Sequence, residues 1–374
     1  MTAHRFLEPL DVIFPRGNKL FGAAGSYGAA LMPPWPSVAA GALRSRMLVD
    51  AGIDLDAFAV GKAPVKGLGT PQSPGPFRVS RFLLARRVEG AVEVLHPVPS
   101  DVVVTENDDR HQARYLQPTV LDEAIATSAP LAHHPALAID KQAKPATGFW
   151  LDAAGWQAWL EDQPIAPDHL VKSEALWRLD DRVGVALAQD TRSAEEGKLF
   201  TVQGVALKKG VGFLVEVVGA EPPATGLVRL GGDGRGAALS PVGTLQWPRP
   251  DYAALANARR CRLVFTGPAL FAGGWRLPGQ NEEGRFQAQG IRGRVVSAAV
   301  PRHGVVSGWD LARQHPKPAE RTVPTAAVYW IEDLEATPEA LERIAREGLW
   351  PEDGPDLQRR AEGFNACEFA AWED

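Results

Sequence analysis

The first fifty residues constrain the fold of this chain more than any other segment. The alternating segment from Phe6 to Phe14 predicts a β-strand, and a loop rich in glycine and proline follows from Pro15 to Pro36. A helix is expected next, with Ser37 as its N-cap. A loop of about 20 residues between two regular elements is uncommon, and when it is ordered it is usually a binding surface.

The composition of this loop favours an ordered segment that contacts a ligand, because disordered linkers are poor in aromatic residues. The loop carries the aromatic and basic residues Arg16, Lys19, Phe21, Tyr27 and Trp35. Gly22 and Gly25 allow the backbone to approach a ligand closely. The helix would present free N–H groups near Ser37, with Arg44 farther along, in a geometry suited to phosphate. The alternative is a plain turn at Gly22 to Gly28, with the aromatic side chains in the core.

Composition indicates an ordinary globular protein of about two domains, since 45% of its 374 residues are hydrophobic and 23% are charged. No apolar run reaches 18 residues and no signal-peptide hydrophobic region is present, which predicts a cytoplasmic protein that does not contact a membrane. Cys261 and Cys367 are too few for a zinc site or a disulfide framework, and no cofactor is expected. With 37 glycines and 31 prolines, the chain favours short strands and ordered loops over a helical bundle.

The charge is unevenly distributed. Residues 331–374 contain 13 Asp or Glu and 4 Arg, a net charge of −9, whereas the whole chain carries −5 and residues 1–330 therefore carry +4. A nonspecific RNA-binding protein is normally basic throughout. Any RNA contact is therefore expected to be local and shared with a partner subunit, and the acidic end is expected to face solvent or that partner.

Strand-like runs recur along the chain and predict largely antiparallel sheets. They are Val79–Arg86, Val92–His96, Val183–Ala188, Leu199–Leu207, Phe213–Val218, Cys261–Thr266, Arg294–Val300 and Thr325–Ile331. The Lys-Lys-Gly-Val-Gly segment between Leu207 and Phe213 predicts a hairpin turn.

Two helices are also expected. The first runs from Leu151 to Leu160, and the second from Pro338 to Glu347, with Thr337 as N-cap and Gly348 beyond its end. The order of strands and helices predicts the α+β class, with two ferredoxin-like (RRM-like) domains and long loop insertions. The expected domains are residues 1–170, with an insertion at about 55–150, and residues 171–374.

A second glycine loop follows the short strand Leu227–Leu230. Gly232 and Gly234 belong to this loop, and Arg235 is placed at its tip. A nucleotide-binding P-loop would end in Gly-Lys-Ser or Gly-Lys-Thr, which this loop lacks. Arg235 is suited to a charge-assisted contact with an RNA phosphate. The alternative is a β-bulge or a tight turn with a solvated arginine.

No set of residues points to catalysis. The eight histidines do not form a catalytic constellation, and a solvated or hydrogen-bonded role is the better interpretation of His133, His134 and His303. The adjacent pairs Asp180-Asp181 and Glu195-Glu196 point to opposite faces if they lie in strands, and are expected to pair with nearby arginines. The hydrolase and metalloprotease signatures are absent from the sequence, so the chain is predicted to be noncatalytic.

Five segments in order resemble one known family. They are Leu10–Phe14 with the glycine loop, Pro33–Arg44, Thr191–Thr201, Arg229–Arg235, and Ser307–Leu311 continuing through Pro316-Lys317-Pro318 to Pro324. This pattern resembles the third subunit of the Cmr complex, a RAMP-superfamily protein of type III-B CRISPR effectors. The resemblance implies two ferredoxin-like domains with long insertions. It also implies a family glycine-rich loop at Gly363–Asn365, followed by a strand from Ala366 to Trp372.

The resemblance further implies a role in antiviral defence, in which the subunit holds the 5′ tag of the CRISPR RNA at the foot of the effector. The expected partners are the CRISPR RNA, the large polymerase-like Cmr subunit, a backbone RAMP subunit and, indirectly, the target RNA. Single-stranded RNA is bound by bases stacked on aromatic groups and by basic groups along the phosphates. The candidate RNA-binding residues are Arg16, Lys19, Phe21, Gly22, Gly25, Trp35, Ser37, Arg44, Gly232, Gly234, Arg235, Arg292, Arg294 and Lys317.

Two other functions remain open from the sequence. A metal-independent endoribonuclease that processes precursor CRISPR RNA would need an essential histidine or tyrosine. A protein-only scaffold would bind neighbouring subunits through the same loops and make no contact with the guide.

Overall fold

The computed structural model describes the chain in nine ranges and three single residues. They are 2–17, 26–107, 110–122, 125, 127, 130–139, 143–231, 234–243, 245, 247–310, 312–354 and 356–373. The chain forms two compact units, each built from three separate segments. The first unit contains residues 1–92, 173–243 and 305–320, and the second contains 93–172, 244–304 and 321–374. The division into ferredoxin-like domains at residue 170 stays a prediction.

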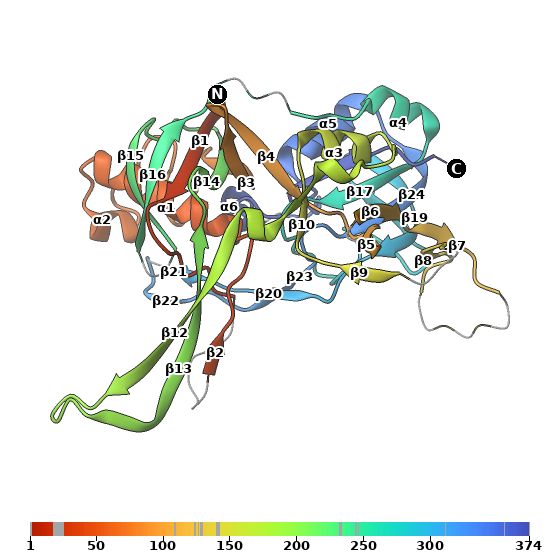
Figure 1. The fold of residues 1–374 in the computed structure, drawn as a ribbon. Helices are drawn as coiled ribbons and strands as arrows, with labels where there is room; N and C mark the ends of the chain where they lie inside the picture. The colour runs from red at the N-terminus through yellow and green to blue at the C-terminus, as the bar shows by residue number, and fades with distance from the viewer. Residues whose placement is uncertain are drawn as a thin grey trace. The chain divides into compact units, whose positions relative to one another are not determined.

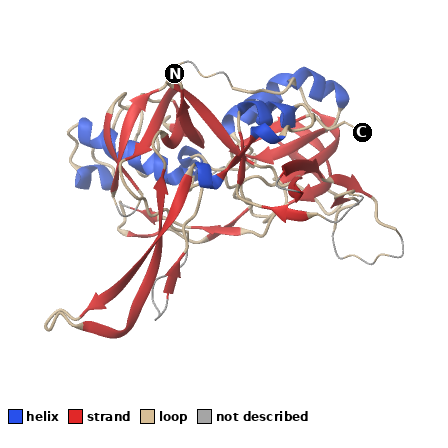
Figure 2. Ribbon diagram, in the orientation of Figure 1, coloured by secondary structure: helices blue, strands red, loops and turns tan. Residues whose placement is uncertain are grey.

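The first unit is mainly β-structure, as Figures 1 and 2 show. Its strands are β1 (Thr2–Pro9), β2 (Ser26–Gly28), β3 (Arg78–Val88), β12 (Trp177–Leu187), β13 (Ala194–Leu207), β14 (Val211–Val218), β15 (Gly226–Leu230), β16 (Arg235–Pro241), β21 (Trp309–Asp310) and β22 (His315–Pro316). Its helices are α1 (Pro36–Asp50), α2 (Leu55–Ala59) and the 3-10 turn Ser173–Ala175. Three strands lie where the chain passes between units: β4 (Ala91–Pro97), β20 (Gly304–Val306) and β23 (Glu320–Thr322).

The main sheet of the first unit has the strand order β3-β14-β1-β16-β15, with every neighbouring pair antiparallel. When β1, β3, β14 and β16 are numbered first to fourth along the chain, their order across the sheet is second, third, first, fourth. Helix α1 follows β1 and packs against β3 and β15. Its Leu43, together with Phe6 and Phe213 of the sheet, is completely buried, so these contacts form the core that holds the unit together.

Two sequence-based boundaries in this unit are wrong. Strand β1 ends at Pro9 and does not continue to Phe14, because Pro9 lacks the N–H that a longer ladder needs. Helix α1 begins at Pro36 with Trp35 as N-cap, so Ser37 is the second helical residue and does not cap the helix. Proline has no N–H and fits the first helical position, and it keeps the preceding Trp35 extended.

A polar cluster lies on the main sheet around Glu216 of β14. Its carboxylate accepts hydrogen bonds from the Ser80 hydroxyl at 2.6 Å and from the Arg81 guanidinium at 3.1 Å, and lies 2.9 Å from His4 Nε2. Burial opposes ionisation of Glu216, but the bonds from His4 and Ser80 and the charge of Arg81 together lower its pKa to about 2. The cluster therefore joins β1, β3 and β14 through an ionised carboxylate.

A long antiparallel hairpin of β12 and β13 extends away from the rest of the first unit in Figure 1. Strand β2 pairs in parallel with β13 and completes a three-stranded sheet. The predicted hairpin turn between Leu207 and Phe213 is wrong, because β13 pairs with β12 and β2, whereas β14 pairs with β1 and β3. The turn only connects two different sheets.

The second unit contains strands β5 (Val102–Asn107), β6 (Arg110–Tyr115), β7 (Gln117–Thr119), β8 (His134–Ala136), β9 (Lys144–Ala146), β10 (Phe149–Leu151), β11 (Leu170–Lys172), β17 (Cys261–Phe265), β18 (Arg285–Ala288), β19 (Ile291–Ala299), β24 (Val328–Glu335) and β25 (Cys367–Ala370). Its helices are α3 (Ala153–Leu160), α4 (Tyr252–Ala258), α5 (Pro338–Glu347), α6 (Leu357–Glu362) and the 3-10 turn Pro167–His169. The α+β class is confirmed.

The main sheet of the second unit has the order β18-β19-β24-β17-β25 and is antiparallel throughout. Both faces are buried, because alternate residues of its strands enter two different clusters. Tyr329 and Ile331 pack in the cluster that includes α5, whereas Val328 and Trp330 pack in the cluster that includes α3. When β17, β19, β24 and β25 are numbered first to fourth along the chain, their order across the sheet is again second, third, first, fourth.

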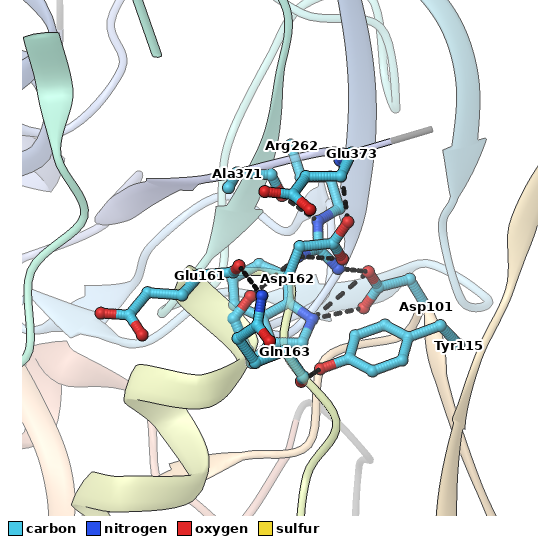
Figure 3. Close-up of polar contacts among 9 residues, drawn as sticks. Asp101, Tyr115, Glu161, Asp162, Gln163, Arg262, Ala371 and Glu373 are labelled. Carbon is cyan, nitrogen blue, oxygen red and sulfur yellow. Dashed lines mark hydrogen bonds and ion pairs between the residues drawn. The ribbon is translucent and has the colours of Figure 1, made fainter. Parts of the chain in front are cut away.

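Arg262 of β17 lies at the centre of a buried ionic network, shown in Figure 3. Its guanidinium lies 2.8 Å from Asp101 Oδ2 and 2.9 Å from Asp162 Oδ1, and donates to the carbonyl oxygens of Trp159 and Ala371 at 2.8 Å. Desolvation by burial raises the pKa of Asp101, against the opposing charge of Arg262. One side chain thus joins β17 to the end of α3 and to the C-terminal strand.

The turn at Gly363–Asn365 is buried, which bears on the glycine-rich loop that the resemblance implies there. The Asn365 amide accepts a hydrogen bond from Leu270 N at 2.8 Å and donates one to Leu349 O at 2.9 Å. Phe364 is 2% exposed and Asn365 is completely buried. The turn therefore holds neighbouring segments of the second unit together and exposes no side chain for an RNA contact.

Candidate functional site

The segment after β1 is fixed to two other parts of the first unit. Leu10 N donates to Gly236 O of β16 at 3.0 Å. Ile13 exchanges two backbone hydrogen bonds with Val205 of β13, at 3.0 and 2.8 Å. These bonds bring together the first loop, the second glycine loop and the long hairpin, which are far apart in the sequence.

A glycine makes this close approach possible. A Cβ atom on Gly204 would lie 2.5 Å from Val12 Cγ1 and 3.0 Å from Phe14 Cε1. The loop side chains therefore occupy the space that any other residue at position 204 would need. Position 204 lies in β13, and its lack of a side chain allows the loop to pack on the hairpin.

Two arginines from distant segments gather on the ring of Phe14. The guanidinium carbon of Arg235 lies 5.0 Å from the ring centroid, and that of Arg182, on β12, lies 5.4 Å from it. Arg182 also pairs with Asp180 at 2.8 Å, and Arg235 lies 3.9 Å from Asp11. We call these five residues the Phe14 cluster; both arginine side chains remain partly exposed, at 44% and 34%.

Hydrogen bonds order the neighbouring part of the loop. Gln203 of β13 donates to the Tyr27 hydroxyl at 2.6 Å and accepts from Ala30 N at 3.2 Å, and the Tyr27 hydroxyl donates to Asp181 at 3.3 Å. Desolvation and the Asp181 carboxylate raise the pKa of Tyr27, so its hydroxyl stays protonated as a donor. The loop is thus ordered against the hairpin on both sides of residues 18–25.

Of the predicted RNA-binding residues that the structure describes, only Arg235 belongs to the Phe14 cluster. Arg16 is exposed in a bridge with Ala30, and Trp35 is half-buried at the start of α1. Arg44 lies over the Phe77 ring at 5.0 Å, which directs its guanidinium to the core of the unit.

Two further predicted residues, Gly234 and Lys317, also belong to the first unit. Gly234 has a φ of 65° and donates to Gly231 O at 3.2 Å, which forms the tight turn before Arg235. Lys317 follows β22, and its amide donates to Gly308 O at 2.8 Å. The predicted sites Lys19, Phe21, Gly22, Gly25 and Gly232 lie outside the described residues.

Arg292 and Arg294 lie on β19 of the second unit, where each pairs with carboxylates of β24. Arg292 lies 3.0 Å from Glu335, and Arg294 lies 2.8 Å from Glu332 and 3.4 Å from Asp333. These ion pairs give both arginines a structural role that requires no ligand. Their contact with RNA stays a prediction.

Sequence reasoning missed Phe14 and Arg182 as parts of the site. Phe14 was assigned to a strand, and Arg182 was expected only to pair with a neighbouring carboxylate, which it does through Asp180. A signal was present, since Arg182 lies in a strand with alternating apolar residues and Gly204 interrupts its partner strand. The pairing of the two strands was needed to place both beside Phe14.

The other face of the hairpin is apolar and exposed. Val183 is 68% exposed, Val185 40%, Leu187 54% and Leu199 55%, and the register places Val185 opposite Leu199. Aliphatic residues that share an exposed face are typical of surfaces that contact another macromolecule. The hairpin therefore presents arginine on one face and aliphatic side chains on the other.

Among the described residues, no three His, Cys, Asp or Glu side chains come together as metal ligands. In the same part of the chain, no helix combines the length and the apolar character needed to cross a lipid bilayer.

The fold and the site define an α+β protein with two antiparallel sheet units, one of which gathers arginines around an aromatic ring. The family model described as CRISPR-associated protein (Cas_Cmr3) matches residues 5–372, and the chain therefore belongs to this family. The resemblance to the third subunit of the Cmr complex is thereby confirmed.

Solved structures show the same fold. A chain of "Cryo-EM structure of the Type III-B Cmr-beta bound to cognate target RNA" matches with a TM-score of 0.51 and 14% identity, over 97% of this chain and 96% of that one. A chain of the same assembly bound to cognate target RNA and AMPPnP, state 1, matches with a TM-score of 0.50 and 14% identity, over 97% and 98%. No curated protein matches the sequence.

Proposed function

We propose that this chain is a noncatalytic RNA-binding subunit of a type III-B CRISPR effector in antiviral defence. It holds the 5′ tag of the CRISPR RNA at the foot of the complex, beside the large polymerase-like subunit and a backbone RAMP subunit. Family membership supports the effector subunit, and similar solved chains come from type III-B complexes bound to target RNA. Target RNA is contacted indirectly, through its pairing with the guide.

The Phe14 cluster is the observation that carries the RNA-binding role. Arg235 ends one of the family segments and Arg182 lies on β12, and both guanidinium groups lie near the Phe14 ring and are partly exposed. Guanidinium groups bind phosphate through paired hydrogen bonds, and an aromatic ring offers a surface on which a base stacks. The exposed aliphatic face of the hairpin supports a further contact with a protein subunit.

Two structural features support the finer parts of the proposal. Each main sheet has the strand order of a ferredoxin-like fold, with one helix following the first strand in the first unit and one following the third strand in the second. The five residues of the Phe14 cluster include no histidine or tyrosine, whereas the alternative endoribonuclease would need one of these as a general acid or base.

Photocrosslinking of the assembled effector tests the role. A guide carrying 4-thiouridine in its 5′ tag should crosslink to peptides within residues 10–46, 178–205 or 229–238. Arg235→Ala should weaken retention of the guide roughly 10- to 150-fold, since a hydrogen bond to a charged group contributes roughly 1.5–3 kcal/mol. Glu339→Gln, in the acidic end, is the matched control and should leave retention unchanged.

Two outcomes would contradict the proposal. Crosslinks confined to other subunits, with normal retention in the Arg235→Ala complex, would leave this chain a scaffold that contacts only protein. Cleavage of precursor CRISPR RNA by the purified chain without metal, with a 5′-hydroxyl product, would make it the processing endoribonuclease instead.

A further inference from the structure

The long hairpin has an open edge that the Phe14 cluster does not use. Strand β12 pairs with β13 on one side, and no other strand that the structure describes pairs with its second side. At 11 residues, β12 is about twice as long as a common strand. Folded proteins normally keep edge strands short or covered, because their unpaired backbone groups bind other strands.

The hydrogen bonds on both sides of β13 show which residues of β12 face this edge. The backbone groups of Val205 bond to Ile13 and therefore point away from Leu179, its partner in β12. Just beyond the ladder, Lys208 N donates to Leu176 O at 2.9 Å, which gives the same assignment. Bonded and non-bonded pairs alternate along an antiparallel ladder. The residues whose N–H and C=O groups face outward, which we call the β12 edge, are therefore Leu179, Asp181, Val183 and Val185.

The charged side chains of β12 give this edge little protection. Asp181 accepts hydrogen bonds from the Tyr27 hydroxyl at 3.3 Å and from the Gln203 amide at 3.1 Å. Arg182 pairs with Asp180 at 2.8 Å. Three of the four charged residues of β12 are thus engaged within the hairpin sheet.

The edge strand of the main sheet in the same unit is protected by the chain itself. Strand β15 has five residues and packs against α1. Arg46 of α1 donates to the carbonyl oxygen of Leu227 at 2.8 Å, which occupies an outward-facing acceptor of β15. The contrast indicates that the β12 edge is available to a partner outside this chain.

The chemistry of the β12 edge selects a peptide strand as that partner. Its N–H donors alternate with C=O acceptors and repeat every two residues, at about 7 Å, and another strand matches both. A phosphate backbone offers acceptors but no such row of donors. The exposed side chains of Val183 and Val185 flank the edge, and the two arginines and two aspartates of β12 cancel, so the strand has no net attraction for a polyanion.

We propose that the β12 edge binds an extended segment of another protein subunit of the effector, which adds to the hairpin sheet as a fourth strand. The proposal rests on the proposed function, which makes this chain one subunit of a larger assembly. The register of β12 with β13 shifts between Val185 and Leu187, so the added strand covers positions 179–185. Aliphatic residues at alternate positions of that segment pack beside Val183 and Val185.

Hydrogen exchange resolved to single residues tests the pairing. In the isolated full-length chain, the amides of Asp181, Val183 and Val185 should exchange rapidly, whereas those of Arg182 and Gly184 should be protected by β13. In the assembled effector, the three outward amides should slow roughly tenfold or more, because exchange then requires the added strand to open. Rapid exchange of these amides in the assembled effector would overturn the proposal.

A proline substitution tests the same edge through assembly. Val183→Pro removes one outward N–H and none of the bonds between β12 and β13, so it should weaken retention of a protein subunit by roughly 5- to 150-fold. Val183→Thr is the matched control, because it keeps the N–H and the branched side chain, and it should retain every subunit. Exchange in β13 reports whether the hairpin stays folded in the proline variant; if it does not, the exchange of the unchanged protein decides.

The outcomes separate this inference from the proposed function. Retention of every subunit by a folded Val183→Pro complex, with guide crosslinks at the Phe14 cluster, would overturn the inference alone. Loss of the guide with all protein subunits retained would replace the peptide partner with RNA. Dimerisation of the isolated chain that Val183→Pro abolishes would make a second copy the partner. Protected outward amides in a complex whose guide never crosslinks to this chain would support the inference and contradict the proposed function.

Discussion

The two units have the same strand order but use it differently. In the first unit, the main sheet anchors an exposed hairpin and a loop that meet at the Phe14 cluster. In the second unit, both faces of the main sheet are covered by apolar clusters that include α3 and α5. One sheet pattern can therefore either carry an exposed hairpin and loop or be covered on both faces by apolar clusters, depending on where the insertions lie.

The buried carboxylates of the two units differ in the same way. Three partners from neighbouring strands surround Glu216 in the first unit and lower its pKa to about 2. Asp101, in the second unit, is completely buried against Arg262, and desolvation raises its pKa. The first carboxylate favours its charged form in the fold, whereas the second favours proton uptake relative to an exposed aspartate.

The largest expected effect comes from removing Arg262. Arg262→Ala should destabilise the second unit by about 3–5 kcal/mol, because it leaves the buried Asp101 carboxylate without the positive charge that it pairs with. Hydrogen exchange should accelerate in β17, β25 and α3, and remain unchanged in β1 and β14 of the first unit. Arg259→Ala, at a side chain that is 60% exposed, is the control and should change little. Equal acceleration of exchange in both units would show that Arg262 does not stabilise the second unit alone.

Acidification should act on the first unit. The pKa of Glu216 is lowered from 4.5 to about 2 in the fold, so its contribution is present above pH 4.5 and is lost as the pH falls toward 2. The loss is expected to be about 2–3 kcal/mol. Exchange rates corrected for their intrinsic pH dependence should rise in β1, β3 and β14. Glu216→Gln should reduce the rise of these exchange rates on acidification. If the rates of that variant rise as much as those of the unchanged protein, groups other than Glu216 cause the acid sensitivity.

A smaller effect is expected at the packing of the loop on the hairpin. Gly204→Ala should cost roughly 1–3 kcal/mol, because the new Cβ would overlap Val12 and approach Phe14. Exchange should accelerate in residues 10–16 and β13, while the second unit stays unchanged. Retention of the guide RNA should fall as well if the Phe14 cluster binds it. A variant with normal exchange in residues 10–16 would show that the loop does not depend on this glycine.

The smallest effect has the opposite sign. Gly41 is exposed in α1, and no atom lies within 4 Å of the position that its Cβ would take. Gly41→Ala should therefore stabilise the first unit by about 0.4–1 kcal/mol, by reducing the freedom of the unfolded chain. A raised urea midpoint with unchanged guide retention is expected. A lowered midpoint would mean that α1 has a contact that the free space around Gly41 does not show.

Helix α5 shows what local sequence signals can predict. Its bounds, Pro338–Glu347, its N-cap Thr337 and its C-cap Gly348 all agree with the sequence-based expectation. Each of these signals acts within one helical turn. The start of α1 was missed although its signal was equally local, because Ser37 was preferred as a cap over the Trp-Pro pair that precedes it.

Pairing between distant strands could not be predicted in the same way. The turn after Leu207 has hairpin residues, yet β14 pairs with β1, about two hundred residues away. The short-range pattern is the same for both outcomes, and only the competition among whole strands decides between them. For the same reason, the sequence indicated Arg235 as a candidate site residue but did not predict its contact with the Phe14 ring beside Arg182. That contact depends on the register of three separate segments.

The interleaving of the two units determines the order in which they can be completed during synthesis. The first unit needs residues 305–320, which leave the ribosome only after most of the second unit has been made. At roughly 5–20 residues per second, the N-terminal segment waits many seconds for its last partner. Neither unit can mature before most of the chain exists, so no single truncation point yields one unit free of segments of the other.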